Sequence, residues 1–405
     1  METFESAADP QLLTINVGSS SLKAAIYRTE GQREEPQRIS ALSISRIGQT
    51  ESQIGVTDEG GVTSERVSAQ PTSRAALQTL LDWLRSTGVG ARLNAIGHRM
   101  VAGGLRFQEP QRVTPEVAAA LRSLIPLAPD HLPAAIEALD TLTRAFPTLP
   151  QVVCFDTAFH YTMPPTAQRY ALPQIPELAE VRRYGFHGLS YESIMRQLSA
   201  LDSQAAAGRV IIAHLGAGAS MVAVREGRSV DTTMGFTPTG GLMMATRSGD
   251  LDPGVLLYLL QQQGMGAEAL ARLVAKEAGL LGVSGRSGDM QELLAREAMD
   301  SRATEAIALF CYQARKFLGA LTTTLGGIET LVFTGGIGEH AAPIRARICA
   351  ELAYLGITLD EARNRASAPI ISPDGAAVTV RVIATDEDLM IARHTLRLLA
   401  QGKHD

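Results

Sequence analysis

Two segments of the chain share one layout, in which an apolar run, a tight glycine-containing turn and a second apolar run follow one another. They comprise residues 12–27 and 209–224. Gly18 in the first segment corresponds to Gly216 in the second, 198 residues later, which is close to half of the 405-residue chain. A repeat at this spacing predicts a duplicated domain, with the two turns facing each other across a cleft.

The glycine turns carry the residue types that bind anions. The first turn, residues 16–23, contains an amide, a glycine, three serines and a lysine. Such a turn directs several backbone N–H groups at one anion without bulky side chains in the way, although an ordinary polar hairpin is the alternative for this segment alone. A third turn, residues 334–339, follows an apolar run and precedes Pro343, which predicts strand, turn and helix. Together the three turns predict an ATP site between paired domains.

Composition excludes several other classes of protein. The chain is long enough for two domains or three, and 45% hydrophobic and 20% charged residues are ordinary for a globular protein. A net charge of −5 without a basic cluster argues against nucleic-acid binding, and no apolar run approaches the roughly 20 residues that span a bilayer. Cys154, Cys311 and Cys349 lack metal-site spacing, and the N-terminus lacks a signal pattern. We therefore expect a cytoplasmic protein with reduced thiols and no membrane partner.

The first half of the chain alternates predicted strands and helices. Three prolines at 126, 129 and 133 predict a stiff irregular stretch, and residues 161–176, with four prolines, predict the domain boundary. The remaining elements expected here are strands within 12–27 and 39–68, a helix over 72–86, a helix over 115–123 and a strand over 151–155.

The second half reuses the same plan. After the hairpin at 209–224 we expect helices to about residue 320, then strands at 331–333 and 378–383. The last element, 386–400, reads as an amphipathic helix with one apolar side formed by Leu389, Ala392, Leu396 and Leu399. We expect this helix to return to the first domain. The predicted domains are therefore 1–160 plus 387–405, and 161–386.

Side chains suited to phosphoryl transfer gather at predicted strand ends. His98 and Arg99 follow one apolar run, Asp156 follows another, and residues 182–188 form a basic turn broken by glycines. Phosphoryl transfer requires cations and donors around the migrating group and carboxylates for magnesium. This combination indicates a kinase-type site.

Six segments, in order along the chain, resemble the signature segments of acetate kinases. The resemblance covers residues 12–397, nearly the whole chain. It implies an α/β chain with the duplicated actin-like ATPase fold of acetate and sugar kinases, Hsc70 and actin, with two domains around a nucleotide cleft. It also implies a homodimer that transfers the γ-phosphoryl group of ATP to a short carboxylate, giving an acyl phosphate. The segments are 98–101, 155–160, 183–188, 231–238, 242–253 and 333–339.

The resemblance also implies catalytic and acceptor-binding roles. Arg99 and Arg247 match the arginines that hold carboxylate and phosphoryl oxygens. His187 matches the donor to the transferring phosphoryl group, and Asp156 the essential aspartate. From the residues alone, solvated arginines and a packed core histidine are the alternatives. The implied acceptor site comprises Arg99, Val101, His131, Phe186 and Pro238.

Metal and nucleotide sites follow from the same resemblance. Asn16 and Glu387 match residues of the Mg²⁺ site, with Mn²⁺ as the alternative ion, although residues 385–388 also fit a helix cap. Lys23 matches a phosphate-site residue, or else lies on the outer face of its strand. The implied nucleotide-binding residues are Lys23, His214, Leu215, Gly216, Ala217, Gly218, Asp289, Met290, Gln291, Gly335, Gly336, Ile337 and Gly338.

Several positions depart from the family pattern and leave the substrate open. Asp130 stands where leucine is usual, Ala217 where asparagine is usual, and Gln291 where arginine is usual. Asp130 would either face solvent or a neighbour, or receive a polar group of a substituted acid. Acetate is the first expectation; propionate or another small acid, a non-catalytic nucleotide-binding relative, and a sugar kinase or phosphatase of the same fold are the alternatives. Paired arginines favour an anionic acceptor over a neutral hydroxyl.

Overall fold

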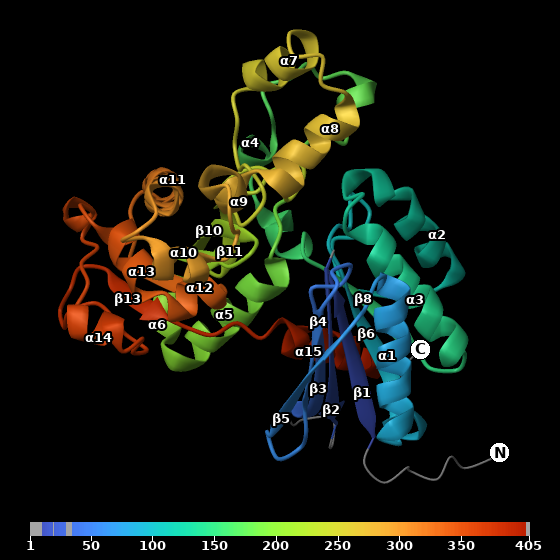
Figure 1. Ribbon diagram of the computed structural model, residues 1–405. Helices are drawn as coiled ribbons and strands as arrows, with labels where there is room; N and C mark the ends of the chain where they lie inside the picture. Colours follow the sequence, from blue (N-terminus) through green and yellow to red (C-terminus); the bar gives the residue numbers. More distant parts are fainter. Residues whose placement is uncertain (1–9, 19, 30–34, 402–405) are drawn as a thin grey trace. The chain divides into compact units, whose positions relative to one another are not determined.

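The computed structural model describes residues 10–18, 20–29 and 35–401. Ser19, in the first glycine turn, lies outside them. By their internal contacts the residues form two compact units, residues 1–158 with 386–405 and residues 159–385 (Figure 1). Each unit contains one β-sheet and its own helices.

The first unit is built on an eight-stranded sheet in the order β5-β4-β3-β2-β1-β6-β8-β7. Helices α1 and α3 contact each other, and their apolar residues join one core cluster with strands β1 to β4 and β6, while α15 contacts β1, β6 and β8. The strands are β1 (Gln11–Val17), β2 (Ser21–Arg28), β3 (Gln37–Ser45), β4 (Ser52–Thr57), β5 (Thr63–Ser68), β6 (Leu93–Met100), β7 (Gln111–Arg112) and β8 (Gln151–Phe155). The helices are α1 (Ser73–Ser86), α2 (Pro115–Ser123), α3 (Leu132–Ala145) and α15 (Glu387–Gln401).

The second unit is built on a five-stranded sheet in the order β11-β10-β9-β12-β13. Its strands are β9 (Arg209–Leu215), β10 (Ala219–Arg225), β11 (Arg228–Thr232), β12 (Thr330–Thr334) and β13 (Thr379–Val382). Its helices are α4 (Pro165–Gln168), α5 (Gly188–Leu201), α6 (Ser203–Ala207), α7 (Pro253–Gln261), α8 (Ala267–Arg272), α9 (Gly279–Ser284), α10 (Met290–Arg296), α11 (Ser301–Leu325), α12 (Gly335–His340), α13 (Ala342–Cys349) and α14 (Glu361–Arg365).

The two sheets repeat one topology. In the first, β3, β2 and β1 are antiparallel neighbours, and β6 and β8 continue the sheet in parallel with β1. In the second, β11, β10 and β9 are antiparallel neighbours, and β12 and β13 continue it in parallel with β9. The duplication that the repeated hairpins predict is therefore confirmed at the level of strand order.

Local sequence explains where the main helices begin and end. The Thr72 side chain accepts the N–H of Ala75 and so caps α1, and leucines at helical spacing bury its inner face. Asp300 caps α11 by accepting two backbone N–H groups. Gly326 ends α11 in the left-handed conformation, with φ of 70°, which glycine adopts without steric cost. Helix α1 begins one residue after its predicted start, and α2 and β8 have their predicted bounds.

Three local predictions are wrong. Helix α3 begins within the proline-rich stretch, because Pro133 occupies a first-turn position whose N–H has no helical acceptor. The segment predicted as a turn, 334–339, is mostly helix α12, which begins directly at Gly335. Pro343 lies in the first turn of the next helix, α13, as predicted. In α15 the buried face includes Ile391 and His394, whereas the predicted apolar residue Leu396 is only half-buried. A prediction with one apolar face misses this, because α15 packs against strands β1, β2, β6 and β8.

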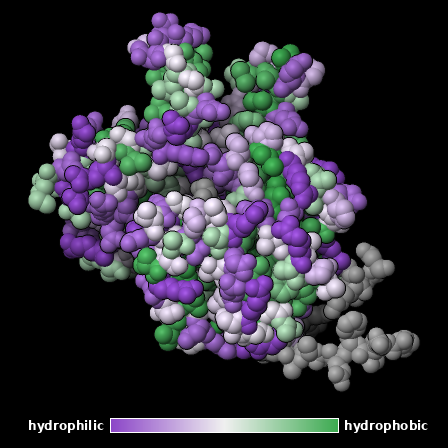
Figure 2. All heavy atoms as spheres, turned by 45° about the vertical axis from the view of Figure 1, so that its right-hand side comes forward, coloured by the Kyte–Doolittle hydropathy of each residue, from purple (hydrophilic) through white to green (hydrophobic). Residues whose placement is uncertain are grey.

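Apolar side chains lie mainly in the two cores. Along β1, Leu13, Ile15 and Val17 face one cluster while Leu12 faces another, as the period of a strand requires. On the face shown in Figure 2, hydrophilic residues separate the hydrophobic ones into small groups. Among the described helices, none has the length and apolar character needed to cross a bilayer.

Candidate active site

The first unit brings together Arg99 and three polar side chains from neighbouring elements. Arg99 lies near the end of β6, Asn16 near the end of β1, Asp156 directly after β8, and Glu387 at the start of α15. Because β1, β6 and β8 are parallel neighbours, their carboxyl ends lie at the same sheet edge, where open α/β sheets place ligands. These four residues of the predicted site therefore form one cluster.

Hydrogen bonds connect the members of this cluster. Arg99 Nε donates to Asp156 Oδ1 at 3.1 Å, and Nη2 of the same guanidinium pairs with Asp156 Oδ2. Nη1 donates to Asn16 Oδ1 at 3.1 Å. Asn16 Nδ2 in turn donates to Glu387 Oε2 at 3.0 Å, and that oxygen lies 3.8 Å from Arg99 Nε. One guanidinium thus orients a carboxylate and an amide.

The ion pair between Arg99 and Asp156 is largely shielded from solvent. The Asp156 side chain is only 1% exposed and the Arg99 side chain 13%. Burial opposes the charge on Arg99, but attraction to Asp156 and Glu387 outweighs it and raises the pKa of Arg99 above its ordinary value. The alternative considered from sequence, that Arg99 is a solvated charge, is therefore wrong.

The three acidic residues at the start of α15 have different surroundings. Asp386 Oδ1 accepts the N–H of Leu389 at 2.9 Å, so Asp386 is the helix cap. Glu387 instead points to Asn16 and Arg99. Burial and the neighbouring Glu387 raise the pKa of Asp388 to about 6. The capping role considered for this segment thus falls to Asp386, and Glu387 has a carboxylate oxygen in the polar cluster.

The second unit holds His187 in a defined orientation. His187 precedes α5 in the left-handed conformation, with φ of 60°, and its Nδ1 shares a 2.8 Å hydrogen bond with Ser220 Oγ. Ser220 Oγ is also hydrogen-bonded to the hydroxyl of Tyr191. The ring stacks on His214 with 4.2 Å between centroids, and His214 Nδ1 lies 2.8 Å from Ser190 Oγ. His187 is therefore packed and also directed by polar partners.

The chain before His187 is held in place by a buried histidine. The two ring nitrogens of His160 lie 3.0 Å from Ser229 Oγ and 2.9 Å from the carbonyl oxygen of Phe186. Gly185 has a φ of 73°, and a Cβ there would lie 2.5 Å from the His160 ring, so only glycine fits. Burial lowers the pKa of His160 to about 4, which keeps the ring neutral near pH 7.

The side chains of Arg247 and His187 both approach the backbone at Gly218. A Cβ placed on Gly218 would be 3.2 Å from His187 Nε2 and 3.7 Å from Arg247 Nη1. Arg247 Nη1 also donates to the carbonyl oxygen of Pro238 at 3.1 Å. The structure therefore brings the second predicted arginine and the predicted histidine to one end of the β9–β10 turn.

The other end of that turn adjoins α12. A Cβ on Gly216 would lie 3.9 Å from the backbone nitrogen of Gly336. Gly335 has a φ of 77°, and a Cβ there would lie 2.7 Å from the carbonyl oxygen of Leu215, so the close approach requires glycine. Residues 214–218 thus extend from the start of α12 to His187 and Arg247.

The predicted acceptor residues divide between the two units. Val101 is buried and His131 is half-buried in the first unit, whereas Phe186 and Pro238 are buried in the second. Asp130 is exposed. Its exposure agrees with the first of the two alternatives, in which this carboxylate faces solvent or a neighbour.

The predicted nucleotide-binding residues outside the glycine turns differ in their burial. Lys23 is an exposed residue of β2. Asp289 caps α10 by accepting the N–H of Glu292 at 2.9 Å. Met290 is buried, so its side chain belongs to the core, while Gln291 is exposed. In this segment Asp289 and Gln291 are exposed and Met290 is not.

The partners of the site residues were not found from sequence. Ser220 and Tyr191 direct His187, but a serine in a strand and a tyrosine in a helix carry no signal of their own. Arg345 is fully buried and donates a hydrogen bond to α12. Nothing in the sequence predicted this contact. For Ser220, the position after the repeated glycine turn is the one usable signal.

Comparison with known proteins shows the family of this chain. The sequence model of the acetokinase family matches residues 11–393. An acetate kinase of Rhodopseudomonas palustris is 48% identical over 398 residues, covering 97% of this chain and 99% of the relative. A crystal structure of Porphyromonas gingivalis acetate kinase has a TM-score of 0.84 and 36% identity, covering 96% of this chain and 100% of its own. A propionate kinase of Francisella tularensis has a TM-score of 0.87 and 35% identity, covering 96% and 99%. The chain belongs to the acetokinase family.

Proposed function

We propose that the protein is a cytoplasmic acetate kinase, which transfers the γ-phosphoryl group of ATP reversibly to acetate and yields acetyl phosphate and ADP. The observation that carries this proposal is the convergence of His187 and Arg247 on Gly218, at one end of a turn whose other end adjoins Gly336. An adenosine-binding turn, a phosphate turn and two donors thus follow one another in the order of the parts of ATP. Likeness to the Rhodopseudomonas palustris enzyme supports acetate as the acceptor.

The second unit supplies donors to the migrating phosphoryl group. We infer that Tyr191 donates to Ser220 Oγ and that Ser220 donates to His187 Nδ1, because these directions place a ring proton of His187 on Nε2, beside Gly218. Arg247 adds a positive charge at the same place. Phosphoryl transfer is catalysed mainly by positioning and by neutralising charge, so these two groups provide what the step needs.

The first unit supplies the cation for the acceptor. The contacts of Arg99 with Asp156 and Asn16 use three of its five N–H groups. The other donors of the guanidinium hold the acetate carboxylate, while Asp156 fixes the orientation of the arginine. Each of the two anions, acetate and ATP, thus has an arginine that offsets its charge.

We also propose that Asn16 and Glu387 hold the Mg²⁺ ion that accompanies ATP. Both offer oxygen atoms, the ligand type that Mg²⁺ prefers, and they lie within hydrogen-bonding distance of each other. Among the described residues, no group of three or more acidic, histidine or cysteine side chains could hold a metal alone. This suits an ion held by one or two protein ligands, water and phosphates, which neutralises charge on the phosphates. Mn²⁺ is the alternative ion.

Glu387→Gln is expected to raise the Mg²⁺ concentration for half-maximal activity at least about tenfold, the range seen when metal-site partners are lost. The amide keeps the size of the side chain but removes its charge. The measurement is initial rate against free Mg²⁺ at saturating ATP. Asp386→Asn is the matched control, because it retains the oxygen that caps α15. An unchanged Mg²⁺ titration for Glu387→Gln, or an equal effect in the control, would remove Glu387 from the metal site.

The acceptor pocket is expected to admit propionate as well as acetate. Asp130 is exposed and supplies no apolar wall in place of the usual leucine, while Val101 and Pro238 are buried. One methylene in an apolar pocket is worth about 1–3 kcal/mol, so kcat/KM for the two acids should agree within about tenfold. Asp130→Leu should shift the ratio toward acetate. Hydroxamate trapping of the acyl phosphate measures both, and a clear preference for glycolate or an amino acid would contradict this account.

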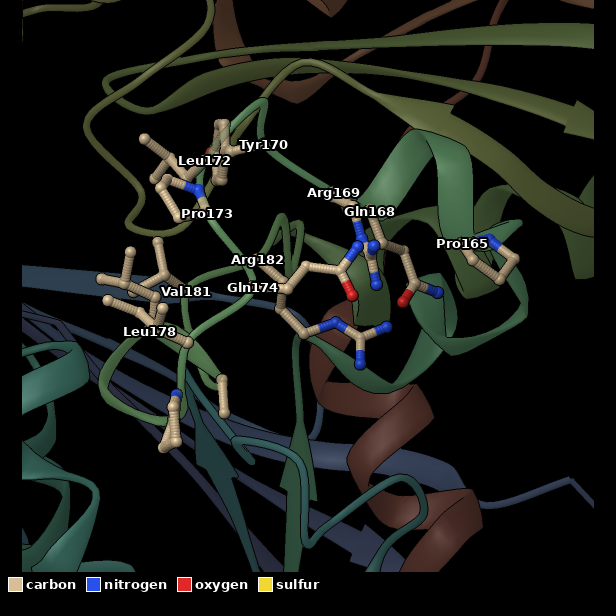
Figure 3. Close-up of a pocket in the computed structure, with 13 residues that line it drawn as sticks. Pro165, Gln168, Arg169, Tyr170, Leu172, Pro173, Gln174, Leu178, Val181 and Arg182 are labelled. Atoms are coloured by element: carbon tan, nitrogen blue, oxygen red, sulfur yellow. The ribbon is translucent and has the colours of Figure 1, made fainter.

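We further propose a homodimer formed through the second unit. Helix α7 is apolar but has no buried residue, and Leu257 and Tyr258 are more than half exposed. Leu172 and Ile175 are also exposed and line a pocket of about 540 Å³ formed by residues 165–182 (Figure 3). Exposed apolar groups of this extent are typical of surfaces that another protein covers.

The proposed reaction is tested by measuring ADP release with acetate, with a neutral sugar, and without an acceptor. A carboxylate kinase releases ADP in proportion to acetate and not with the sugar. Release only with the sugar would indicate a sugar kinase. Binding of ATP without turnover under all conditions would indicate a non-catalytic relative.

A further inference from the structure

Arg345, in α13, is a fully buried arginine whose hydrogen-bond acceptors are all neutral. Nε donates to Asn364 Oδ1 at 2.8 Å, and Nη2 donates to the Asn364 carbonyl oxygen at 2.7 Å and to Ser367 Oγ at 3.0 Å. Nη1 donates to the carbonyl oxygens of Gly338 at 2.8 Å and Glu339 at 2.9 Å. The side chain is 0% exposed. Burying a guanidinium costs free energy, and here five short hydrogen bonds offset that cost.

Two of these bonds hold the end of α12. Gly338 and Glu339 belong to its last turn, where carbonyl groups lack acceptors from within the helix. A cation at this place also interacts favourably with the helix dipole. Helix α12 has only six residues, too few to be stable without tertiary contacts. Arg345 therefore provides the C-terminal anchor of α12.

The anchor reaches the start of α12 through Glu339. Its carboxylate oxygen Oε1 accepts the N–H of Gly335 at 2.9 Å and the N–H of Thr385 at 3.3 Å. Arg345 holds the backbone of Glu339, and the Glu339 side chain holds the first residue of the helix. The position of residues 335–338 thus depends in part on Arg345.

The other side of the anchor is a fixed part of the fold. Asn364, at the end of α14, is buried, and its Nδ2 donates to the carbonyl oxygen of Ala342 at 3.0 Å. Helices α13 and α14 are therefore bonded to each other as well as to Arg345. A movement of α12 relative to them would break the bonds from the guanidinium to Gly338 and Glu339.

We propose that Arg345 is a positioning residue for the nucleotide, which sets the affinity for ATP by holding α12 against the β9–β10 turn. The inference rests on the proposed function, in which residues 335–338 contact the adenosine part of ATP. Loss of the anchor loosens these residues and leaves the cluster of Arg99 and Asp156 unchanged. The expected signature is a change in the KM for ATP without a change in the KM for acetate.

Arg345→Lys tests the inference, because lysine keeps the charge but cannot reach acceptors on both α12 and α14 at once. The KM for ATP should rise at least about tenfold, the effect of losing one or two buried hydrogen bonds. The KM for acetate should stay within about twofold, since this affinity depends on other groups. Hydrogen exchange of the backbone in residues 335–341 should become faster. Arg347→Lys is the control in the same helix, because Arg347 forms a partly exposed ion pair with Glu297.

Two further variants keep the outcome interpretable. Ser367→Ala removes a single acceptor of Arg345 and should raise the KM for ATP about two- to threefold if Arg345→Lys does not fold. Gly336→Ala tests the nucleotide turn itself, because a Cβ there meets nothing within 4 Å in the free protein. If Gly336→Ala leaves the KM for ATP unchanged, the proposed turn fails and the inference fails with it. If Gly336→Ala raises this KM but Arg345→Lys and Ser367→Ala do not, the inference alone is overturned.

Discussion

Arg247→Ala is expected to lower kcat/KM at least about 100-fold, the usual effect of removing one charged donor from a developing negative charge. Arg247 Nη1 and His187 Nε2 lie beside Gly218, so the variant removes one of two donors at the proposed position of the migrating phosphoryl group. The loss should appear mainly in kcat, because the contact strengthens as charge develops. Steady-state kinetics with ATP and acetate measure it.

The fold should tolerate this substitution. Arg247 is half-buried, and the loop around it is held by backbone bonds such as the one between Met244 N–H and the Arg247 carbonyl oxygen, at 3.1 Å. The thermal midpoint should therefore change little. Arg228→Ala, at an exposed position of β11, is the matched control. An Arg247→Ala enzyme within threefold of the wild type would show that this arginine is only a solvated charge.

Arg99→Ala is expected to lower both activity and stability. The activity loss should again be at least about 100-fold, since the acceptor loses its cation. In addition, Asp156 would remain buried without its guanidinium, and breaking a buried pair in this way costs about 3–5 kcal/mol. Denaturant unfolding followed by circular dichroism measures the second effect and steady-state kinetics the first.

A double variant separates the two effects. Adding Asp156→Ala to Arg99→Ala removes the uncompensated charge, so part of the stability should return while activity stays low. A stable and active single variant would contradict the assignment of Arg99. A stable but inactive one would contradict only the argument from burial.

Sequence predicted the fold well where its signals are local. The repeat of the two hairpins required only the strand period and matching glycines, and the order of both sheets confirms the duplication. The prediction from sequence failed where tertiary contacts determine the local structure. Prolines around Pro133 suggested an irregular stretch, yet the first turn of α3 accommodates that residue. The faces of α15 could not be read from one apolar stripe, because the helix contacts several strands.

The residues of the candidate site could be predicted only in part, and there is a physical reason why the others could not. Charged residues such as Arg99, near the end of a strand, and Arg247, in a loop, belong to recognisable segments. Their supports do not, because Ser220 and Arg345 act through contacts between residues far apart in the chain. Only the structure distinguishes Asp386, the helix cap, from Glu387, which faces the polar cluster.

The most direct test of the account is ³¹P nuclear magnetic resonance of the purified protein with ATP, Mg²⁺ and acetate. The account predicts that the γ-phosphate signal of ATP declines while signals of ADP and acetyl phosphate rise together, and that acetyl phosphate with ADP regenerates ATP. Inorganic phosphate as the direct product, without acetyl phosphate and without acetohydroxamate when hydroxylamine is present to trap the acetyl group, would contradict it.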